Sequence, residues 1–222
     1  MHEPRATPAV GPGAWSDYYD KTGRRPPRET LLRALDAFER EPGGPRRAVD
    51  LGCGGGRDIA EMLRRGWTVL AIDAEATAIE RLTARENLPP TGRLETRIGR
   101  FEEIEWPAAE LVNSSFALPL CPPRSFPALW SRIAGSLGPG GRFAGQLYGD
   151  RDEWFGDPSI TFHSAREVDS LLHGFEVEYL REEEDDSVTP RGRPKHWHIF
   201  HIVARKKGWR LSRGCPTSGS GA

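Results

Sequence analysis

The chain has 222 residues, enough for one domain with a substantial buried core. Its 37% hydrophobic and 28% charged residues are ordinary for a globular protein, and a formal net charge of −1 offers no general attraction to nucleic acid or to an anionic membrane. No apolar run approaches the length of a membrane span and no signal-like segment starts the chain, so we expect a cytoplasmic protein that binds neither membranes nor nucleic acid.

The cysteines support the same compartment. Cys53, Cys121 and Cys215 are odd in number and widely separated, which is unlike a disulfide framework and fits a reducing environment. The sequence contains no CxxC or His-x-x-x-His grouping, so no metal site is expected.

The N-terminal part of the chain predicts a lead, an aromatic segment and a helix. Residues 1–13 are rich in Pro, Gly and Ala and are expected to be flexible, ahead of a single domain at residues 14–207. Aromatic residues concentrate at 14–19, and residues 29–40 carry Leu and Phe side chains at helical spacing. The plain interpretation of residues 14–40 is an amphipathic helix that the aromatic side chains pack against the domain.

A strand, a glycine turn and a helix follow. The strand ends at Leu51, and Gly52, Gly54 and Gly56 come before an apolar pattern with helical spacing. Glycines permit positive φ and a close approach of a ligand to the backbone, while the helix N-terminus offers unpaired N–H groups. This spacing is one residue short of the dinucleotide fingerprint G-x-G-x-x-G, and Asp50 suits a ligand with an ammonium or hydroxyl group. The alternative is a tight turn without a ligand.

The sequence VDLGCGGGRD, at residues 49–58, resembles the first motif of class I S-adenosylmethionine-dependent methyltransferases. Within that class the chain is similar to the tellurite-resistance-type group, from about residue 15 to residue 207. The resemblance implies S-adenosyl-L-methionine as cofactor, S-adenosyl-L-homocysteine as product, and cofactor contacts from Asp50, Gly52, Cys53 and Gly54. In this family the region before the first strand closes over the cofactor, which makes Tyr19, Arg24 and Arg25 candidates for a lid.

The second strand is predicted at residues 68–72, and Asp73 stands at its carboxyl end. A carboxylate there can accept hydrogen bonds from both hydroxyls of a ribose, because it has two oxygens. The alternative is that Asp73 caps a helix that begins at Ala74. Together with the glycine turn, the position favours ribose binding, with Ala74 beside it.

A third strand is predicted at residues 94–98, followed by a short polar segment. The resembled family commonly has an acid that faces the adenine amino group at the position of Arg100. Either Glu102 or Glu103 takes that role here, or Phe101 and backbone groups hold the adenine by stacking and contact.

The fourth strand is predicted at residues 110–115, and ligands of doubly wound sheets bind beyond the carboxyl ends of the strands. Ser114, Ser115 and Phe116 should therefore lie beside the reacting methyl group. This segment lacks the two prolines of nucleic-acid amino-methyltransferases. Cys121 does not match the setting of a nucleophilic cysteine, so a buried loop cysteine is expected.

The remaining elements complete an α/β, Rossmann-like doubly wound sheet of seven strands. A helix capped by Ser125, a strand at residues 142–147 and an aromatic loop at 148–161 come first. A capping box at residues 164–167 then opens another helix. The last two strands, from Phe175 and at 196–204, have no helix between them. They predict a C-terminal antiparallel β-hairpin with an acidic connector at 182–186, before a disordered tail at 208–222.

The chemistry expected from the resemblance is in-line methyl transfer to a small molecule. The protein then mainly positions donor and acceptor, and a general base is needed only for a protonated acceptor. His163 and His196 are the candidate bases, with His198 beside them, although a single histidine is more often a packed or solvated residue. A regulatory or non-methylating cofactor-binding protein is the alternative, and an oxidoreductase is disfavoured by the glycine spacing and the hairpin.

The acceptor pocket is expected at the carboxyl edge of the sheet. Its walls would come from Trp154 and Phe155, residues 116–121, His163 and the strand at 196–197. Such walls suit a compact, partly apolar acceptor or a soft chalcogen nucleophile. No obligate protein partner is apparent from the sequence.

Overall fold

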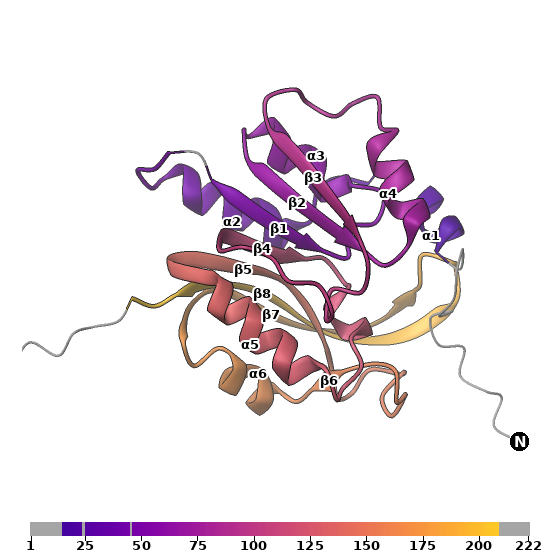
Figure 1. The fold of residues 1–222 in the computed structure, drawn as a ribbon. Coiled ribbons are helices and arrows are strands. Elements are labelled where there is room, and N and C mark those ends of the chain that lie inside the picture. Colours follow the sequence, from indigo (N-terminus) through magenta and orange to yellow (C-terminus); the bar gives the residue numbers. More distant parts are fainter. Residues whose placement is uncertain (1–14, 24, 45, 209–222) are drawn as a thin grey trace, which may run out of the picture.

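The computed structural model of the protein describes residues 15–23, 25–44 and 46–208. One sheet with the strand order β3-β2-β1-β4-β5-β8-β7 forms its centre, and a short β6 pairs with β5 off this path (Figure 1). The strands are β1 (Arg47–Leu51), β2 (Thr68–Asp73), β3 (Arg93–Ile98), β4 (Ala109–Ser114), β5 (Leu137–Gly149), β6 (Phe162–His163), β7 (Phe175–Val188) and β8 (Pro194–Lys206). The helices are α1 (Ser16–Thr22), α2 (Glu29–Glu39), α3 (Arg57–Arg64), α4 (Ala76–Thr83), the 3-10 helix η1 (Leu118–Leu120), α5 (Phe126–Ser136) and α6 (Ala165–Leu171).

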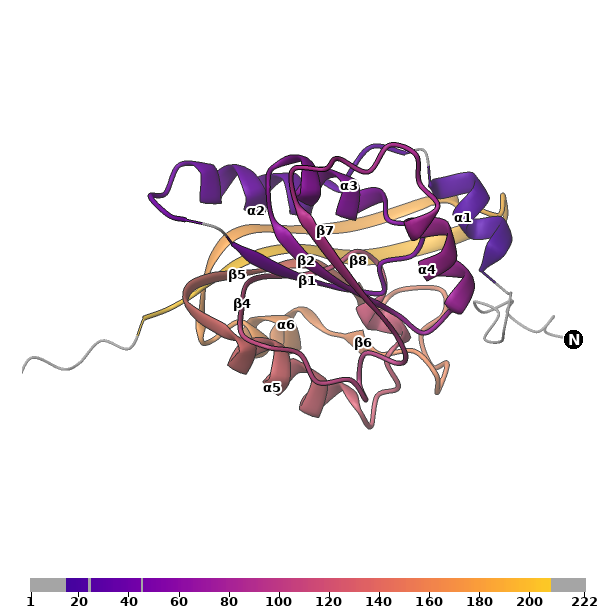
Figure 2. The same ribbon diagram turned by 45° about the horizontal axis from the view of Figure 1, so that its top comes forward.

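Helices cover both faces of the sheet. Successive strand residues point to opposite faces, so Ala48 packs with α2, α3 and α4, while Val49 packs with α5 and α6. Figure 2 shows these two helical layers on either side of the strands. Full burial of a Leu or Ile side chain stabilises a fold by roughly 1.5–3 kcal/mol, and β1, β2 and β4 are built of such buried residues. The predicted doubly wound architecture is confirmed.

The strand order reverses at β1, which pairs in parallel with both β2 and β4. The carboxyl ends of these three strands therefore lie side by side, and the glycine turn, Asp73 and Ser115 follow directly from them. In open α/β sheets this edge is where ligands bind. The last two strands form an antiparallel hairpin as predicted, and β8 also pairs antiparallel with β5.

The hairpin is longer than predicted. Residues 182–186, expected as an acidic connector, belong to β7 and pair with residues 196–200 of β8. Their charge does not oppose strand formation because β7 is an edge strand with mostly exposed side chains, and basic groups of β8 and Arg151 neutralise several of them. The two-residue β6 is an eighth strand that sequence periodicity cannot reveal, because it is too short to show alternation.

Two helix caps were predicted, and one of them forms through the side chain. Ser164 and Glu167 make the expected capping box at the start of α6. Ser125 occupies the N-cap position of α5, but its side chain makes no capping hydrogen bond. The lead at residues 1–13, Arg24 and nearly all of the predicted tail lie outside the described residues. Within the described part of the chain, no helix combines the length and apolar character needed to span a bilayer.

Candidate active site

The glycine turn after β1 has the backbone geometry that the sequence predicts. Gly52, Gly54 and Gly56 have φ values of 74°, 51° and 78°, a region that disfavours residues with a Cβ atom. A Cβ at Gly52 would lie 2.2 Å from the Cβ of Ala117, and one at Gly56 would lie 2.2 Å from Leu82 Cδ1. These two glycines therefore allow close packing of the turn against its neighbours, and the turn lies against the end of β2.

A cavity of about 250 Å³ lies at the carboxyl ends of β1, β2 and β4. Helix α1 forms its opposite wall through Trp15, Tyr18 and Tyr19. We call it the donor cavity. Most of the predicted cofactor residues line it: Tyr19, Asp50, Gly52, Cys53, Gly54, Asp73, Ala74, Phe101, Glu102, Ser115 and Phe116. Ser114 does not, because its hydroxyl is buried and donates to the carbonyl of Leu51 at 2.9 Å.

Buried acids gather at one end of the donor cavity. Asp50 Oδ1 accepts a 2.8 Å hydrogen bond from Asn113 Nδ2. Burial, with the nearby carboxylate of Asp58, raises the pKa of Asp50 to about 8. Asp58 accepts hydrogen bonds from the Ser115 hydroxyl and, at 3.0 Å, from the backbone N–H of Arg28. Sequence reasoning missed Asp58, although it directly follows the glycine turn as the second residue of α3.

Asp73 is fixed by the backbone on both sides. Its Oδ2 accepts from the N–H of Gly54 at 2.8 Å and its Oδ1 accepts from the N–H of Glu75 at 2.9 Å. Each carboxylate oxygen keeps a further lone pair for a ligand hydroxyl. Helix α4 begins at Ala76 with Glu75 as its N-cap residue, so Asp73 precedes the cap position itself. Glu75 also lines the donor cavity, which adds a second acid on this side.

The segment after β3 distinguishes between the two acids considered for the adenine end. Glu102 lines the donor cavity together with Arg100, and Arg100 Nε donates to Glu102 Oε1 at 2.6 Å. The side chain of Glu103 is 70% exposed and is not part of the cavity wall. Phe101 is buried beside them.

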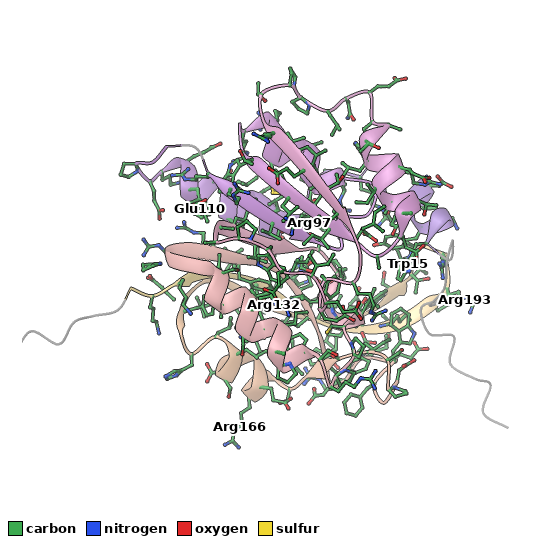
Figure 3. All side chains as sticks on the ribbon, in the orientation of Figure 1. Trp15, Arg97, Glu110, Arg132, Arg166 and Arg193 are labelled. Carbon is green, nitrogen blue, oxygen red and sulfur yellow. The ribbon has the colours of Figure 1, made fainter. Side chains whose placement is uncertain are left out.

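A second cavity of about 610 Å³ adjoins the first, and we call it the acceptor cavity. Trp15, Tyr18, Phe116 and Leu120 line both cavities. The other walls come from the aromatic side chains of Tyr148, Trp154 and Trp197, from Arg25 and Arg28, and from the outer part of the β7–β8 hairpin. Figure 3 shows Trp15 and Arg193 on the same side of the molecule, where α1 meets the hairpin. Phe155, expected in this wall, is 54% exposed and lines neither cavity.

Phe116 separates the two cavities in a strained conformation. Its φ is 60°, which is unusual for an aromatic residue and costs on the order of 1–3 kcal/mol. Gln146 Oε1 accepts its backbone N–H at 3.1 Å, and the Arg28 guanidinium lies 4.3 Å from its ring centroid. A strained backbone persists only where the surrounding contacts fix it. Residues of this kind cluster at active sites and ligand-binding sites.

The structure does not bring the candidate histidines into either cavity. His163 is buried against Phe126, and burial lowers its pKa to about 4. His196 is exposed and lies 2.7 Å from Asp186, whose carboxylate raises the pKa of the imidazole. His198 is fully buried and accepts the backbone N–H of Arg151 at 3.1 Å. Cys121 is a buried loop cysteine, as expected.

Comparison with known proteins agrees with this geometry. Residues 48–141 match the family described as methyltransferase domain. These residues form a methyltransferase domain. They include the glycine turn, Asp73, the segment around Glu102 and β4, and so supply most of the donor cavity. A search of curated proteins finds no match to the chain.

Solved structures share the fold of this methyltransferase domain and of its flanking elements. TehB from Haemophilus influenzae has a TM-score of 0.67 at 18% identity, covering 87% of this chain and 66% of that one. The chain thus spans just under two thirds of the length of that TehB chain. An S-adenosylmethionine-dependent methyltransferase from Methanosarcina mazei has a TM-score of 0.59 at 19% identity, with coverages of 78% and 97%. Magnesium protoporphyrin IX methyltransferase from Synechocystis, with bound S-adenosylhomocysteine, has a TM-score of 0.62 at 13% identity, with coverages of 87% and 94%.

The family match and the shared fold agree with the predicted class I methyltransferase, for which the sequence implies S-adenosylmethionine as cofactor. The residues of the donor cavity fit that group. Asp50, Asp58 and Asp73 are all buried there, while Arg57 is the cation that lies against Asp58. A ligand ammonium group would stabilise the ionised form of Asp50, which burial otherwise keeps protonated, and a ligand hydroxyl pair would donate to the oxygens of Asp73.

Proposed function

We propose that the protein transfers the methyl group of S-adenosylmethionine to a small molecule held in the acceptor cavity. The observation that carries the proposal is that the donor and acceptor cavities adjoin and share Phe116 and Leu120. A methyl donor in one cavity and an acceptor in the other would meet at Phe116. A regulatory protein that only binds the cofactor would not require the second, aromatic cavity.

Within the donor cavity we assign parts of the cofactor to the residues that suit them. Asp73, with Glu75 beside it, would accept the ribose hydroxyls. Asp50 and Asp58 would face the ammonium group, and the Arg57 guanidinium would face the cofactor carboxylate. Phe101 and Glu102 would border the adenine. The backbone of Gly54 and Gly55 leaves the space that the methionine part requires, because neither residue carries a Cβ atom.

The bound cofactor supplies an electrophilic methyl group: a lone pair of the acceptor bonds to the methyl carbon while the sulfur–methyl bond breaks and its electron pair returns to sulfur. The protein contributes position and the exclusion of water, which can lower such a barrier by up to about 7–11 kcal/mol. The Phe116 ring and the α1 side chains would hold the acceptor at the junction of the cavities. If an acceptor arrives protonated, Glu183 and Asp185 are carboxylates of the cavity wall that can accept the proton.

A small acceptor is favoured by the size and lining of the cavity. Its volume of about 610 Å³ lies in the range of small-molecule sites, and Tyr148, Trp154 and Trp197 make much of the wall apolar. The net charge of −1 and the absence of a Pro-Pro pair between Asn113 and Phe116 weigh against a polynucleotide. The free thiols of the buried Cys53 and Cys121 support a reducing compartment, and we place the reaction in the cytoplasm.

The test uses S-adenosylmethionine with a deuterated methyl group and a cell extract divided by size. We expect the label to appear in a low-mass product, with formation of S-adenosylhomocysteine. The Trp154→Ala and Trp197→Ala variants should reduce this turnover by about tenfold or more while leaving cofactor affinity nearly intact. Label in protein or nucleic acid would contradict the small acceptor, and cofactor binding without any transfer would favour the regulatory alternative.

A further inference from the structure

Arg28 is a half-buried cation at the wall of the acceptor cavity. Its guanidinium lines the acceptor cavity over the face of Phe116. The Nε atom is shielded from solvent and has no hydrogen-bond partner, and no side chain that the structure describes (residues 15, 18–23, 25–44 and 46–208) forms an ion pair with Arg28. Its backbone N–H binds Asp58, so the start of α2 holds the residue in place independently of the side chain.

Arg142, a fully buried arginine, shows which partners Arg28 lacks. Arg142 is 1% exposed and forms ion pairs with both Glu41 and Glu178, at 2.6 and 2.7 Å. Two carboxylates therefore neutralise the charge of Arg142 in the folded protein. Burial, with Arg57 and then Arg25, lowers the pKa of Arg28, and Tyr18 and Asp58 offset only part of that shift. A guanidinium remains charged at neutral pH even so, and its charge calls for an anion.

We propose that Arg28 binds a carboxylate, or a group of like charge, on the methyl acceptor. This rests on the proposed function of the acceptor cavity. The planar guanidinium presents parallel N–H donors that match two carboxylate oxygens, while the aromatic walls of Tyr148 and Trp197 cover the remainder of the molecule. The substrate class is a small organic acid with an apolar or aromatic body.

The position of Arg28 also orients the acid. The acceptor cavity is cationic around Arg25 and Arg28, whereas its hairpin side carries both signs of charge, from Glu183 and Asp185 and from Arg191 and Arg193. The four hairpin side chains offset one another in sign, so an anion is attracted to the side of Arg25 and Arg28. Because Phe116 lines both cavities, the acidic end of the molecule then lies next to the donor cavity. A carboxylate is already deprotonated at neutral pH and needs no general base. This agrees with the absence of His163, His196 and His198 from the cavity walls.

The experiment measures binding by the intact chain saturated with S-adenosylhomocysteine. The probes are small carboxylic acids, each paired with its own primary amide, beginning with benzoate and benzamide and extending to indole and short aliphatic acids. Ligand-observed NMR gives the affinities. The variants are Arg28→Gln, Arg28→Lys and the control Arg166→Gln, which removes the same charge from an exposed position on α6, far from the cavities (Figure 3).

For each acid that binds the wild type, the affinity should be about tenfold or more higher than that of its amide. Arg28→Gln should abolish this preference, Arg28→Lys should keep part of it as a point charge, and Arg166→Gln should not change it. Equal affinity for acids and amides, or a preference that survives Arg28→Gln, overturns the proposal. A loss of S-adenosylhomocysteine affinity in Arg28→Gln also overturns it, by assigning Arg28 to the cofactor. This experiment measures only binding. A failure of methyl transfer would appear in the experiment with the deuterated cofactor and would count against the proposed function instead.

Discussion

The side-chain amide of Asn113 donates a 2.8 Å hydrogen bond to Asp50 Oδ1 across two neighbouring parallel strands, where the two residues are direct register partners. Asn113 also reaches Asp58 Oδ2 at 3.4 Å. One amide group thus links two buried acids at the edge of the donor cavity. The raised pKa of Asp50 follows from this crowding as well as from burial, and it makes the fold sensitive to pH.

The first prediction concerns stability and pH. With a folded pKa of about 8 against an ordinary value of 3.8, Asp50 holds a proton in the folded state that the unfolded chain has already lost over this range. The free energy of unfolding should therefore fall as the pH rises from about 4 to about 8. Asp50→Asn should flatten this dependence by on the order of a few kcal/mol between pH 5 and pH 8. Urea unfolding of the wild type and of Asp50→Asn at pH 5 and at pH 8 measures this difference, and the exposed Asp169→Asn is the control. An unchanged slope in Asp50→Asn contradicts the assignment.

The second prediction concerns the ribose. Asp73→Ala should weaken binding of S-adenosylhomocysteine by about ten- to a hundredfold, because the hydroxyls lose their acceptor. Asp73 also orders the N–H groups of Gly54 and Glu75, so Asp73→Asn, which keeps one acceptor oxygen and the shape, should lose less. Calorimetry gives the affinities and thermal melting reports the folded state. If Glu75→Gln proves the more damaging change, the ribose belongs to Glu75 instead.

The third prediction concerns residues 15–28. Trp15 and the α1 residues Tyr18 and Tyr19 line the donor cavity, and α1 packs against α4. We predict that this segment opens in the free protein and orders over the bound cofactor. Hydrogen exchange should slow in residues 15–28 on addition of S-adenosylhomocysteine and remain unchanged in α6, which lies far from the cavity. Equal exchange with and without ligand would reduce α1 to a fixed wall.

The fourth prediction concerns the histidines. His163, with a pKa near 4 and no access to either cavity, is neutral at physiological pH. His196 is engaged by Asp186 and Glu184 on the hairpin. His163→Gln and His196→Gln should each retain turnover to within about twofold, and the pH profile of kcat should keep its shape. A large loss in kcat with unchanged melting temperature would restore the role of general base to that residue.

The donor side of the site could be predicted from the sequence because its signals are local. Asp50, Gly52 and Gly54 stand within one strand–turn–helix unit, and Asp73 follows directly at the end of the next strand. Their geometry depends on backbone rules for a βα turn and for adjacent parallel strands, which short patterns express. The positive φ values at the glycines and the position of Asp73 agree with those rules.

The acceptor side could not be predicted in the same way, because its residues meet only through the tertiary fold. That the Arg28 guanidinium forms no ion pair with the described side chains is a property of packing, and nothing in the basic segment around it distinguishes it from Arg25. The role of His196 likewise depends on the register of the long hairpin, which sets Asp186 opposite it. The tryptophans were anticipated from their loop and strand, but their common cavity depends on β5 and β8 lying side by side.

The two walls unique to the acceptor cavity come from opposite ends of the described chain. Arg25 and Arg28 precede the matched domain at 48–141, and Tyr148, Trp154 and the hairpin follow it. On the proposed function, most residues that bind the methyl donor lie in the central stretch, and most residues that select the acceptor lie on either side of it. On the proposed function, proteins that share the central stretch can differ in acceptor, and exchange of the β7–β8 hairpin between them would leave every residue of the donor cavity in place.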